Sequence, residues 1–331
     1  MKKVFMLMVA ATMMMVGCKQ NNQPVEVQEP VQEGAVVYMT KEISPEALVK
    51  IYEALGVKAE GRVAVKISTG EAGGHNYLKP ELIGDLVKHV NGKLVECNTT
   101  YAGQRRTTEQ HLKVIEDHGF NTIGGVDIMD AEGEFQIPVR DTTYMKYNLV
   151  GKNLANYDFL INLAHFKGHQ MGGFGGVLKN QSIGVASANG KAYIHSNGRN
   201  LVPEEWFNYA EPENQDKFLE CMANAATAVS DYFKGKVIYI NVMNNMSIDC
   251  DCNGNPKAPE LKDMGILAST DPVALDQACL DLVYQHQNAE GDDATSLIQR
   301  VEKQHGVHTI EHAEKIGLGS RKYHIVNIDE Q

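Results

Sequence analysis

The 331-residue sequence has no apolar run long enough to cross a bilayer as a helix, no internal repeat and no linker-like segment within its main part. Its longest apolar run, Val4–Val16, is shorter than the roughly 20 residues that a spanning helix needs. The absence of a linker predicts one large domain, or two interlocked lobes, over residues 35–331.

Positive charge is also scarce. The chain has 31 Lys and Arg residues against 42 Asp and Glu residues, which gives a net charge of −11. An acidic protein repels phosphate backbones and anionic lipid headgroups. We therefore expect no nucleic-acid partner and no direct binding of anionic lipid by the body of the protein.

The six cysteines do not form the pattern of a disulfide-stapled scaffold. Without Cys18, which belongs to the N-terminal signal described below, five remain. They are Cys97, Cys221, Cys250, Cys252 and Cys279. Because five is odd, at least one thiol is free or bound to metal. Cys221 and Cys279 lie on apolar helical faces and are predicted to be core residues.

The N-terminus has the pattern of an export signal, with Lys2 and Lys3 before the apolar run and Gly17-Cys18 after it. Residues 15–18 resemble a bacterial lipobox, with Met15 where leucine is usual. The resemblance implies cleavage before Cys18 and a diacylglyceryl thioether on its sulfur. A plain secretory signal is the alternative.

Lipidation of Cys18 would divide the chain into a signal peptide (1–17), a disordered tether rich in Gln, Asn, Pro and Glu (18–34) and a folded domain (35–331). Loss of two lysines with the signal would bring the net charge to −13. The expected location is the bacterial cell envelope, on the periplasmic or surface side, with the lipid as the membrane contact.

Short apolar segments alternate with helical patterns along the domain. The strand-like segments are Ala35–Tyr38, Arg62–Ile67, Lys93–Glu96, Phe159–Ala164, Val237–Val242, Gly265–Leu267 and His324–Ile328. Ser44-Pro45 and Asp271-Pro272 each combine a capping side chain with proline at the first helical position, and Pro212–Lys234 has an apolar stripe. This alternation predicts an α/β fold with a largely parallel or mixed sheet flanked by helices.

The segment 162–196 is rich in glycine, histidine and lysine. A buried strand would deliver His165 and His169 to a glycine loop, with Lys179 and His195 following. Gly173, Gly175 and Gly176, together with Asn180, would let a ligand or cofactor approach the backbone closely. A tight packing loop is the alternative.

Ligands of open α/β sheets collect beyond the carboxyl ends of the strands. The polar loops Ser68–His75, Cys97–Arg106, His165–Lys179 and Ser247–Glu260 all follow predicted strands. We expect these four loops to share one crevice.

Several motifs, in order, resemble the family of domain of unknown function 362, whose members are often labelled iron-sulfur centre proteins. The resemblance covers about Arg62 to Tyr284. It is carried by Asn98-Thr99-Thr100-Tyr101 with Arg105 and His111-Leu112, His165-Phe166-Lys167-Gly168-His169, Gly173-Phe174-Gly175-Gly176 with Lys179-Asn180, Cys250-Asp251-Cys252, Gly265–Ser269 and Asp271–Ala274.

Many members of that family carry ferredoxin-type cysteine runs shortly after the position of His195. The corresponding interval here, Ser196–Glu220, contains no cysteine. Because a cubane cluster needs a thiolate on each iron, a ferredoxin-type iron-sulfur cluster is not expected. An export signal without twin arginines agrees with this, since a cluster assembled in the cytoplasm could not cross the membrane with an unfolded chain.

A weaker resemblance concerns the spacing of His169, Lys179 and His195, which is similar to that of nickel-pincer lactate racemases. There a lysine carries the cofactor and a histidine ligates nickel, and His75 would match a further active-site histidine. The same export argument disfavours this cofactor, which is made in the cytoplasm.

The segment Asp249-Cys250-Asp251-Cys252-Asn253-Gly254, followed by Glu260, satisfies a calcium-loop pattern. A strand in place of the preceding helix, and two prolines within the loop, disfavour it. Cys250 and Cys252 would alternatively offer two thiolates to zinc or iron, or form a redox pair. An inert polar loop is the remaining alternative.

Three further groups have simpler interpretations. Arg105 would suit a carboxylate or phosphate on a substrate. Asp271 is best interpreted as a helix cap. The cluster His305, His308 and His312 is interpreted as part of a solvated helix.

Together these patterns predict a metal-dependent small-molecule site in an envelope lipoprotein. A divalent zinc, iron or calcium ion would be held by a subset of His75, His169, His195, Asp249, Cys250, Asp251 and Cys252. Lys179 or His165 would move a proton and Arg105 would orient an anionic substrate. Isomerisation, hydrolysis and redox chemistry all remain open.

Two alternatives remain open as well. One is a lipoprotein that binds a small anionic ligand without turnover. The other is a scaffold with a decayed site, in which His165, His169, Lys179 and His195 would not converge.

Overall fold

A computed structural model describes residues 33–203 and 205–330. The expected signal peptide, the lipidated Cys18 and nearly all of the tether lie outside the described residues. Residues 33–331 form one compact unit. Among the described helices, none is both long and apolar enough to cross a membrane.

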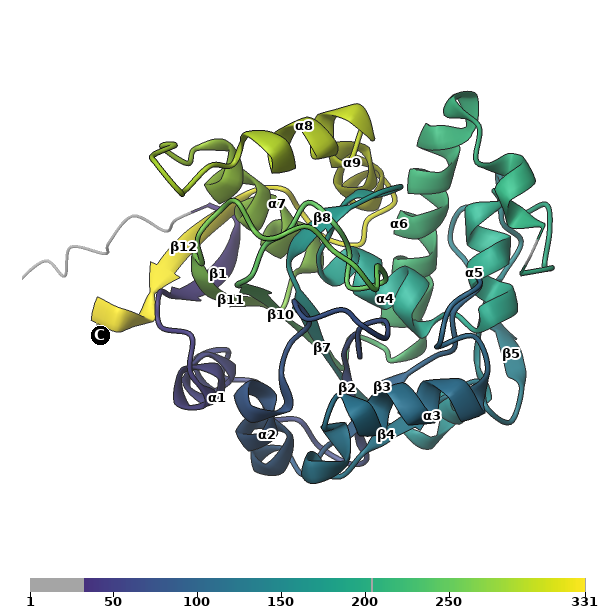
Figure 1. Ribbon diagram of the computed structural model, residues 1–331, viewed down its shortest axis with the longest axis horizontal. Helices are drawn as coiled ribbons and strands as arrows, with labels where there is room; N and C mark the ends of the chain where they lie inside the picture. The colour runs from purple at the N-terminus through teal and green to yellow at the C-terminus, as the bar shows by residue number, and fades with distance from the viewer. Residues whose placement is uncertain (1–32, 204, 331) are drawn as a thin grey trace, which may run out of the picture. The chain divides into compact units, whose positions relative to one another are not determined.

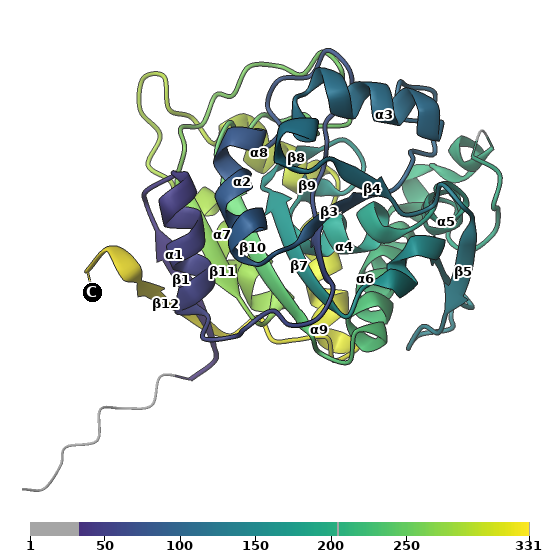
Figure 2. The same ribbon diagram turned by 90° about the horizontal axis from the view of Figure 1, so that it is seen from below.

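The core of the fold is an eight-stranded sheet in the order β12-β1-β11-β10-β7-β2-β3-β4 (Figures 1 and 2). Every neighbouring pair is parallel except the two pairs made by β11, which runs antiparallel to β1 and β10. The strands are β1 (Ala35–Thr40), β2 (Val63–Lys66), β3 (Lys93–Glu96), β4 (Val126–Ile128), β7 (Phe159–His165), β10 (Val237–Met243), β11 (Gly265–Ser269) and β12 (Tyr323–Asn327). The predicted α/β class and mixed, largely parallel sheet are confirmed.

Helices cover both faces of this sheet (Figure 1). They are α1 (Pro45–Ala54), α2 (Pro80–His89), α3 (Thr108–Asp117), α4 (Val177–Val185), α5 (Ala188–His195), α6 (Gln215–Tyr232), α7 (Pro272–Tyr284), α8 (Thr295–Lys303) and α9 (Val307–Lys315). The predicted helix over 212–234 is present, but its first turn, Pro212–Asn214, is a separate 3₁₀ turn.

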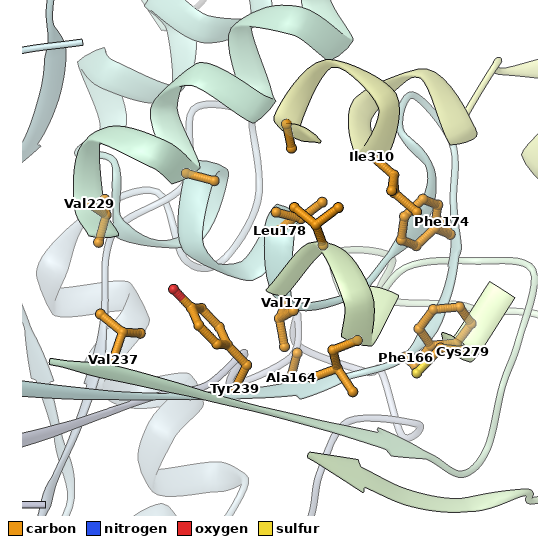
Figure 3. Close-up of a cluster of buried hydrophobic side chains, with 14 of the residues drawn as sticks. Ala164, Phe166, Phe174, Val177, Leu178, Val229, Val237, Tyr239, Cys279 and Ile310 are labelled. Carbon is orange, nitrogen blue, oxygen red and sulfur yellow. The ribbon is translucent and has the colours of Figure 1, made fainter. Parts of the chain in front are cut away.

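The two faces of the central strands pack into separate cores because side chains alternate along a strand. Ile161 and Leu163 of β7 join the cluster under α1 and α2, whereas Leu160 and Ala164 join the cluster under α4, α6 and α7. Figure 3 shows the second cluster. Both faces of β7 are therefore buried, as its mostly apolar sequence predicts, and its one central polar residue, Asn162, donates hydrogen bonds to Val177 and Gln181.

The two proline-led helix starts form as predicted. The Ser44 hydroxyl accepts a hydrogen bond from the Ala47 N–H at 3.0 Å. The Asp271 carboxylate accepts from the N–H groups of Val273 and Ala274 at 2.8 and 3.0 Å. The interpretation of Asp271 as a cap is confirmed.

Some elements were not predicted. Strand β4 extends the sheet beyond β3, and β5 (Glu134–Ile137) pairs with β6 (Asn148–Gly151) in a separate hairpin. The glycine segment also contains a small hairpin, β8 (Lys167–His169) with β9 (Gly173–Gly175). These strands are too short, or too rich in glycine and polar residues, to show period-two hydrophobicity.

A buried carboxylate fixes the start of α4. Asp276 of α7 accepts hydrogen bonds from the N–H groups of Val177 and Leu178, both at 2.9 Å, and from the Asn241 side chain at 2.8 Å. Gly176 stands directly before α4, where a Cβ atom would lie 2.2 Å from an Asp276 oxygen. Glycine is required at this position for close packing.

We predict that Gly176→Ala lowers the free energy of unfolding by about 1–3 kcal/mol, because the added methyl overlaps a carboxylate that has no room to move. Urea denaturation measures this change. The matched control is Gly172→Ala, whose Cβ would meet the terminal methyl of Met222 and the Phe174 carbonyl, both at 3.3 Å, without the overlap found at Gly176, and should cost less than about 1 kcal/mol. Equal effects of the two substitutions would contradict the prediction.

Candidate metal and small-molecule site

A cavity of about 710 Å³ lies beyond the carboxyl ends of β2, β3, β7 and β10. Residues from all four loops that the sequence placed at one crevice line it. They include Ser68, Thr99, Thr100, Tyr101, Arg105, Lys167, His169, Lys179, Cys250 and Cys252, joined by Lys66, Glu96, Asn180, Lys191, His195, Trp206 and Phe207. The parallel strands bring these loops together as expected.

Three side chains on this wall gather their ligand atoms in one place. One atom each from His169, Cys250 and Cys252 lie within 4.8 Å of one another. His169 and Cys250 are buried and Cys252 is half-buried. Two thiols and an imidazole at this spacing are a donor set for a transition metal ion.

The cluster favours a thiolate on Cys250. The Cys250 sulfur accepts hydrogen bonds from the Lys179 ammonium at 3.6 Å and from the Cys252 N–H at 3.2 Å. Burial by itself raises the pKa of Cys250, but a hydrogen bond with the Cys252 side chain, the charge of Lys179 and a hydrogen bond with His169 outweigh it and hold the pKa well below its usual value. The hydrogen bond with Cys250, together with burial, raises the pKa of Cys252.

The β8–β9 turn fixes the ring of His169. Its Nδ1 accepts hydrogen bonds from the backbone N–H groups of Met171 and Gly172, at 3.2 and 2.8 Å. Because Nδ1 is an acceptor, the ring proton lies on Nε2, and the ring also hydrogen-bonds to Cys250. Burial, aided by the charge of Lys179, lowers the pKa of His169 and keeps the ring neutral.

His165 and Asp251 lie outside the cysteine–histidine cluster and contact each other. Asp251 contacts His165 Nδ1 at 2.9 Å and Lys167 Nζ at 2.8 Å, while His165 Nε2 hydrogen-bonds to the Asn244 carbonyl at 2.6 Å. His165 does not line the cavity, and both of its nitrogens have protein partners. This arrangement fastens the cysteine loop to the end of β7.

The calcium-loop hypothesis is wrong for this loop. Asp249 accepts a hydrogen bond from the Lys257 N–H at 3.0 Å, and Asp251 is paired as above. Within residues 33–203 and 205–330, the cysteine–histidine cluster is the one group of three His, Cys, Asp or Glu residues close enough to hold an ion, so Asp249, Asp251 and Glu260 do not converge. Strand β10 precedes the segment in place of the helix that a calcium-binding loop needs, so the loop does not fold around an ion.

The remaining predicted site residues divide between the cavity wall and its surroundings. Gly176 and Asn180 line the cavity, whereas Gly173, Gly175 and His75 are not among the lining residues, and His75 is exposed. Gly173 has φ +77° and packs against Gly306, so this glycine serves the turn.

His195 lines the cavity but stands outside the three-residue cluster. Its Nδ1 donates a hydrogen bond to the Lys191 carbonyl at 2.7 Å, and its ring lies between Trp206 and Phe218, with centroid distances of 4.6 and 4.9 Å. Burial lowers its pKa to about 3. The ring is therefore neutral, and Nε2 is left as a lone-pair acceptor.

A buried charge network was missed by the sequence interpretation. Lys66 Nζ lies 3.1 Å from Glu96, and the Arg105 guanidinium lies 3.4 Å from Glu96 and 3.5 Å from Glu71. Burial lowers the pKa of Lys66 to about 8. Lys66 and Glu96 end β2 and β3, and a charged residue at the end of an apolar strand was the available signal.

Two comparisons place the chain among known proteins. The family model described as a domain of unknown function (DUF362) matches residues 63–281. No curated protein matches the sequence. The solved structure of the lactate racemase apoprotein from Thermoanaerobacterium thermosaccharolyticum is similar at 15% identity and a TM-score of 0.43, over 75% of this chain and 57% of that one. A likeness of this strength carries no functional argument.

We predict that Glu96→Gln lowers the free energy of unfolding by about 3–5 kcal/mol at pH 7, because Lys66 and Arg105 lose their shared buried carboxylate. Denaturation of both proteins measures the difference. The control is Glu116→Gln, which removes an exposed partner of Lys113 and should cost no more than about 1 kcal/mol.

The effect should depend on pH. Burial raises the pKa of Glu96, but the charges of Lys66 and Arg105 outweigh burial and lower the pKa from 4.5 to about 2. The carboxylate thus stabilises the fold fully above pH 4.5, and this contribution is lost as the pH falls through about 2. A difference between wild type and Glu96→Gln that stays constant from pH 6 to about 2 would contradict the assignment.

Proposed function

The chain belongs to the DUF362 family, and on the cysteine–histidine cluster in its cavity we propose that it binds a transition metal ion in a small-molecule site. One observation carries the proposal: the ligand atoms of His169, Cys250 and Cys252 lie within 4.8 Å of one another on the wall of a 710 Å³ cavity. Thiols brought together only by core packing would have apolar neighbours. These thiols have an imidazole and an ammonium beside them.

The donor set favours zinc or iron over calcium. Thiolate and imidazole are preferred by zinc and iron, whereas calcium takes oxygen ligands. Because Nδ1 of His169 accepts two backbone N–H groups, the ring would bind the ion through Nε2 and give up the Nε2 proton. Three protein ligands would then leave a tetrahedral ion one open position, which is the arrangement of catalytic zinc sites. Because Cys252 and His169 both line the cavity, that position would face a bound small molecule.

Residues around the cluster would assist in distinct ways. The Lys179 ammonium, within 3.6 Å of the Cys250 sulfur, would balance thiolate charge and is placed to give a proton to a ligand atom. Trp206 and Phe207 stack at 3.8 Å beside the cavity and would exclude water from it. The neutral ring of His195 has a lone pair on Nε2, which would accept a hydrogen bond from the ligand.

We also propose that the protein is a lipoprotein of the bacterial cell envelope, anchored through Cys18. The support is the lipobox-like sequence Met15–Cys18 behind a short apolar run. A metal supplied after export fits this location, since soft metal ions bind directly to preformed thiolates.

A second candidate function is thiol chemistry without metal. The observation that favours it is the proton on His169 Nε2, because a ring that donates to the Cys250 sulfur stabilises a thiolate. In this case Cys250 would be the nucleophile and Cys252 its neighbouring thiol. Metal content separates the two candidates.

We predict that the intact protein, purified without chelators, contains about one zinc or iron ion per chain by elemental mass spectrometry. Cys250→Ser and Cys252→Ser should each lower the bound metal at least about tenfold, because each removes one of three ligands. Cys97→Ser is the matched control, since Cys97 lines the same cavity outside the cluster and should retain its metal. If the wild-type protein contained no metal, the metal proposal would be wrong and thiol chemistry would be the remaining candidate.

We predict that wild-type protein partitions into the detergent phase of Triton X-114 and that Cys18→Ser moves to the aqueous phase, because the serine variant has no sulfur to carry lipid. Intact-mass spectrometry would show the mass of two acyl chains on wild type alone. Equal partitioning of the two proteins would contradict the anchor.

A further inference from the structure

Five cationic side chains line the cavity: Lys66, Arg105, Lys167, Lys179 and Lys191. All five are buried or nearly so. A buried cation is stable only when its N–H groups meet acceptors. The acceptors that the protein supplies to each cation therefore decide which of them is free for a ligand.

Lys66 has a full set of partners, and four of the five N–H donors of Arg105 are engaged by the protein. The Lys66 ammonium meets Glu96, Asn180 and the Ile67 carbonyl, one for each of its donors. The Arg105 guanidinium reaches Glu71, Glu96, Thr69 and Tyr101. A substrate anion would have to displace these bonds. Arg105 is therefore better explained as a residue that positions the loop after β3 than as the predicted substrate anchor.

Lys167 and Lys179 are held by the cysteine loop. Lys167 contacts Asp251 and the His165 carbonyl, both at 2.8 Å. Lys179 donates to the Cys250 sulfur, and the pKa of Lys179 stays above its usual value, since the cysteines and Asp251 outweigh the burial that would lower it. Both charges are thus committed to the cluster described above.

Lys191 of α5 differs from the other four. Its ammonium donates to the Ala186 carbonyl at 2.6 Å, and among the described residues no carboxylate lies within 4.0 Å of it. Glu96 and Asp130 act on it only through space, and Asp130 already accepts the N–H groups of Asn98 and Ala188. Lys191 lines the cavity and is 5% exposed, and among the described residues the Ala186 carbonyl is the one acceptor for its three N–H donors.

Two hydroxyls on the same cavity wall also have no partner. The Oγ1 atoms of Thr99 and Thr100 are buried and make no hydrogen bond to the protein. Trp206 connects this loop to α5, because its Nε1 donates to the Thr100 carbonyl at 3.0 Å and its ring stacks on His195. Unpaired buried hydroxyls are costly, so a ligand acceptor is the simplest partner.

We propose that Lys191, Thr99 and Thr100 form a subsite for a carboxylate group of the small molecule, an assignment that rests on the small-molecule site proposed above. One ammonium and two hydroxyl donors match the two oxygens and single charge of a carboxylate. A phosphate dianion would bring a second charge, for which the wall has no further uncommitted cation, since Lys167 and Lys179 are held by the cysteine loop. The subsite and the thiol cluster share one cavity, so the ligand would span them.

The two cysteines allow a direct test, because iodoacetate and iodoacetamide alkylate the same thiolate and differ only in carrying a carboxylate or an amide. In both cases the sulfur–carbon bond forms as iodide leaves. The ratio of the two rates is independent of the fraction of thiolate, so a change of the thiol pKa in a variant cancels. Peptide mass spectrometry follows Cys250 and Cys252 in intact protein treated with a chelator.

The ratio of the iodoacetate rate to the iodoacetamide rate should fall about 3- to 10-fold in Lys191→Met and stay near wild type in Lys191→Arg, which keeps the charge. A Thr99→Val and Thr100→Val double variant should lower it at least about twofold, since the valine side chains match the shape of threonine without the hydroxyl. Lys113→Met, which removes an exposed charge, is the matched control and should leave the ratio unchanged. Circular dichroism verifies folding of each variant.

Three results would overturn the subsite. They are an unchanged ratio in Lys191→Met, a fall in that variant with none in the threonine double variant, and protection of the thiols by inorganic phosphate at lower concentration than by acetate. Failure of the metal proposal would be seen in a different measurement. Wild type would then lack metal on elemental analysis, while the alkylation ratio would still change in the Lys191→Met variant. The two ideas can therefore fail separately.

Discussion

The contacts of Asp251 with His165 and Lys167 are the constraint on which the site depends. They tie the loop after β10 to the end of β7, and the backbone follows, since the Gly168 N–H donates to the Ser247 carbonyl at 2.8 Å and the Glu71 N–H to the Asp251 carbonyl at 2.7 Å. A Cβ on Gly168 would lie 2.3 Å from the Ile248 oxygen, so the two segments are in closest contact there. Asp251 thereby places the cysteines on either side of it beside His169. Loops after β2, β7 and β10 are thus joined at Asp251, through its carboxylate to His165 and Lys167 and through its backbone carbonyl to Glu71.

Buried charge is unusually dense around this cavity, and most of it serves position. Lys66, Glu96 and Arg105 pair with one another on the cavity wall, and such networks cost desolvation energy that their mutual attraction roughly offsets. Their effect is to fix which side chains remain free. After the committed pairs are set aside, Lys191, Thr99 and Thr100 line the cavity with donors that lack protein acceptors, and the thiols with Lys179 form a second group. Under our proposals the cavity would combine a soft donor set with a carboxylate subsite.

Much of the fold was predictable because local sequence and burial agree. Largely apolar runs such as Phe159–Ala164, interrupted only by Asn162, indicate strands covered on both faces, and Ser44 and Asp271 cap helices as their proline neighbours indicate. His169, Lys179, Cys250 and Cys252 were also found from their spacing, and the structure brings all four to one cavity wall.

The calcium-loop prediction failed because the pattern records ligand types and not the helix that must precede them. Lys66 and Glu96 were missed because a single charged residue at the end of a strand does not reveal which distant residue pairs with it.

The sequence by itself determined the layered α/β architecture, the strands that carry the loops and the acidic surface charge, because these follow from local periodicity and composition. Only the tertiary structure decided which cations are neutralised by partners distant in the chain. Glu71 and Arg105, or Asp251 and Lys167, are paired by the packing of separate loops, and no local pattern encodes that choice. The free donors of Lys191 are visible for the same reason: whether a charge is available depends on everything that surrounds it in three dimensions.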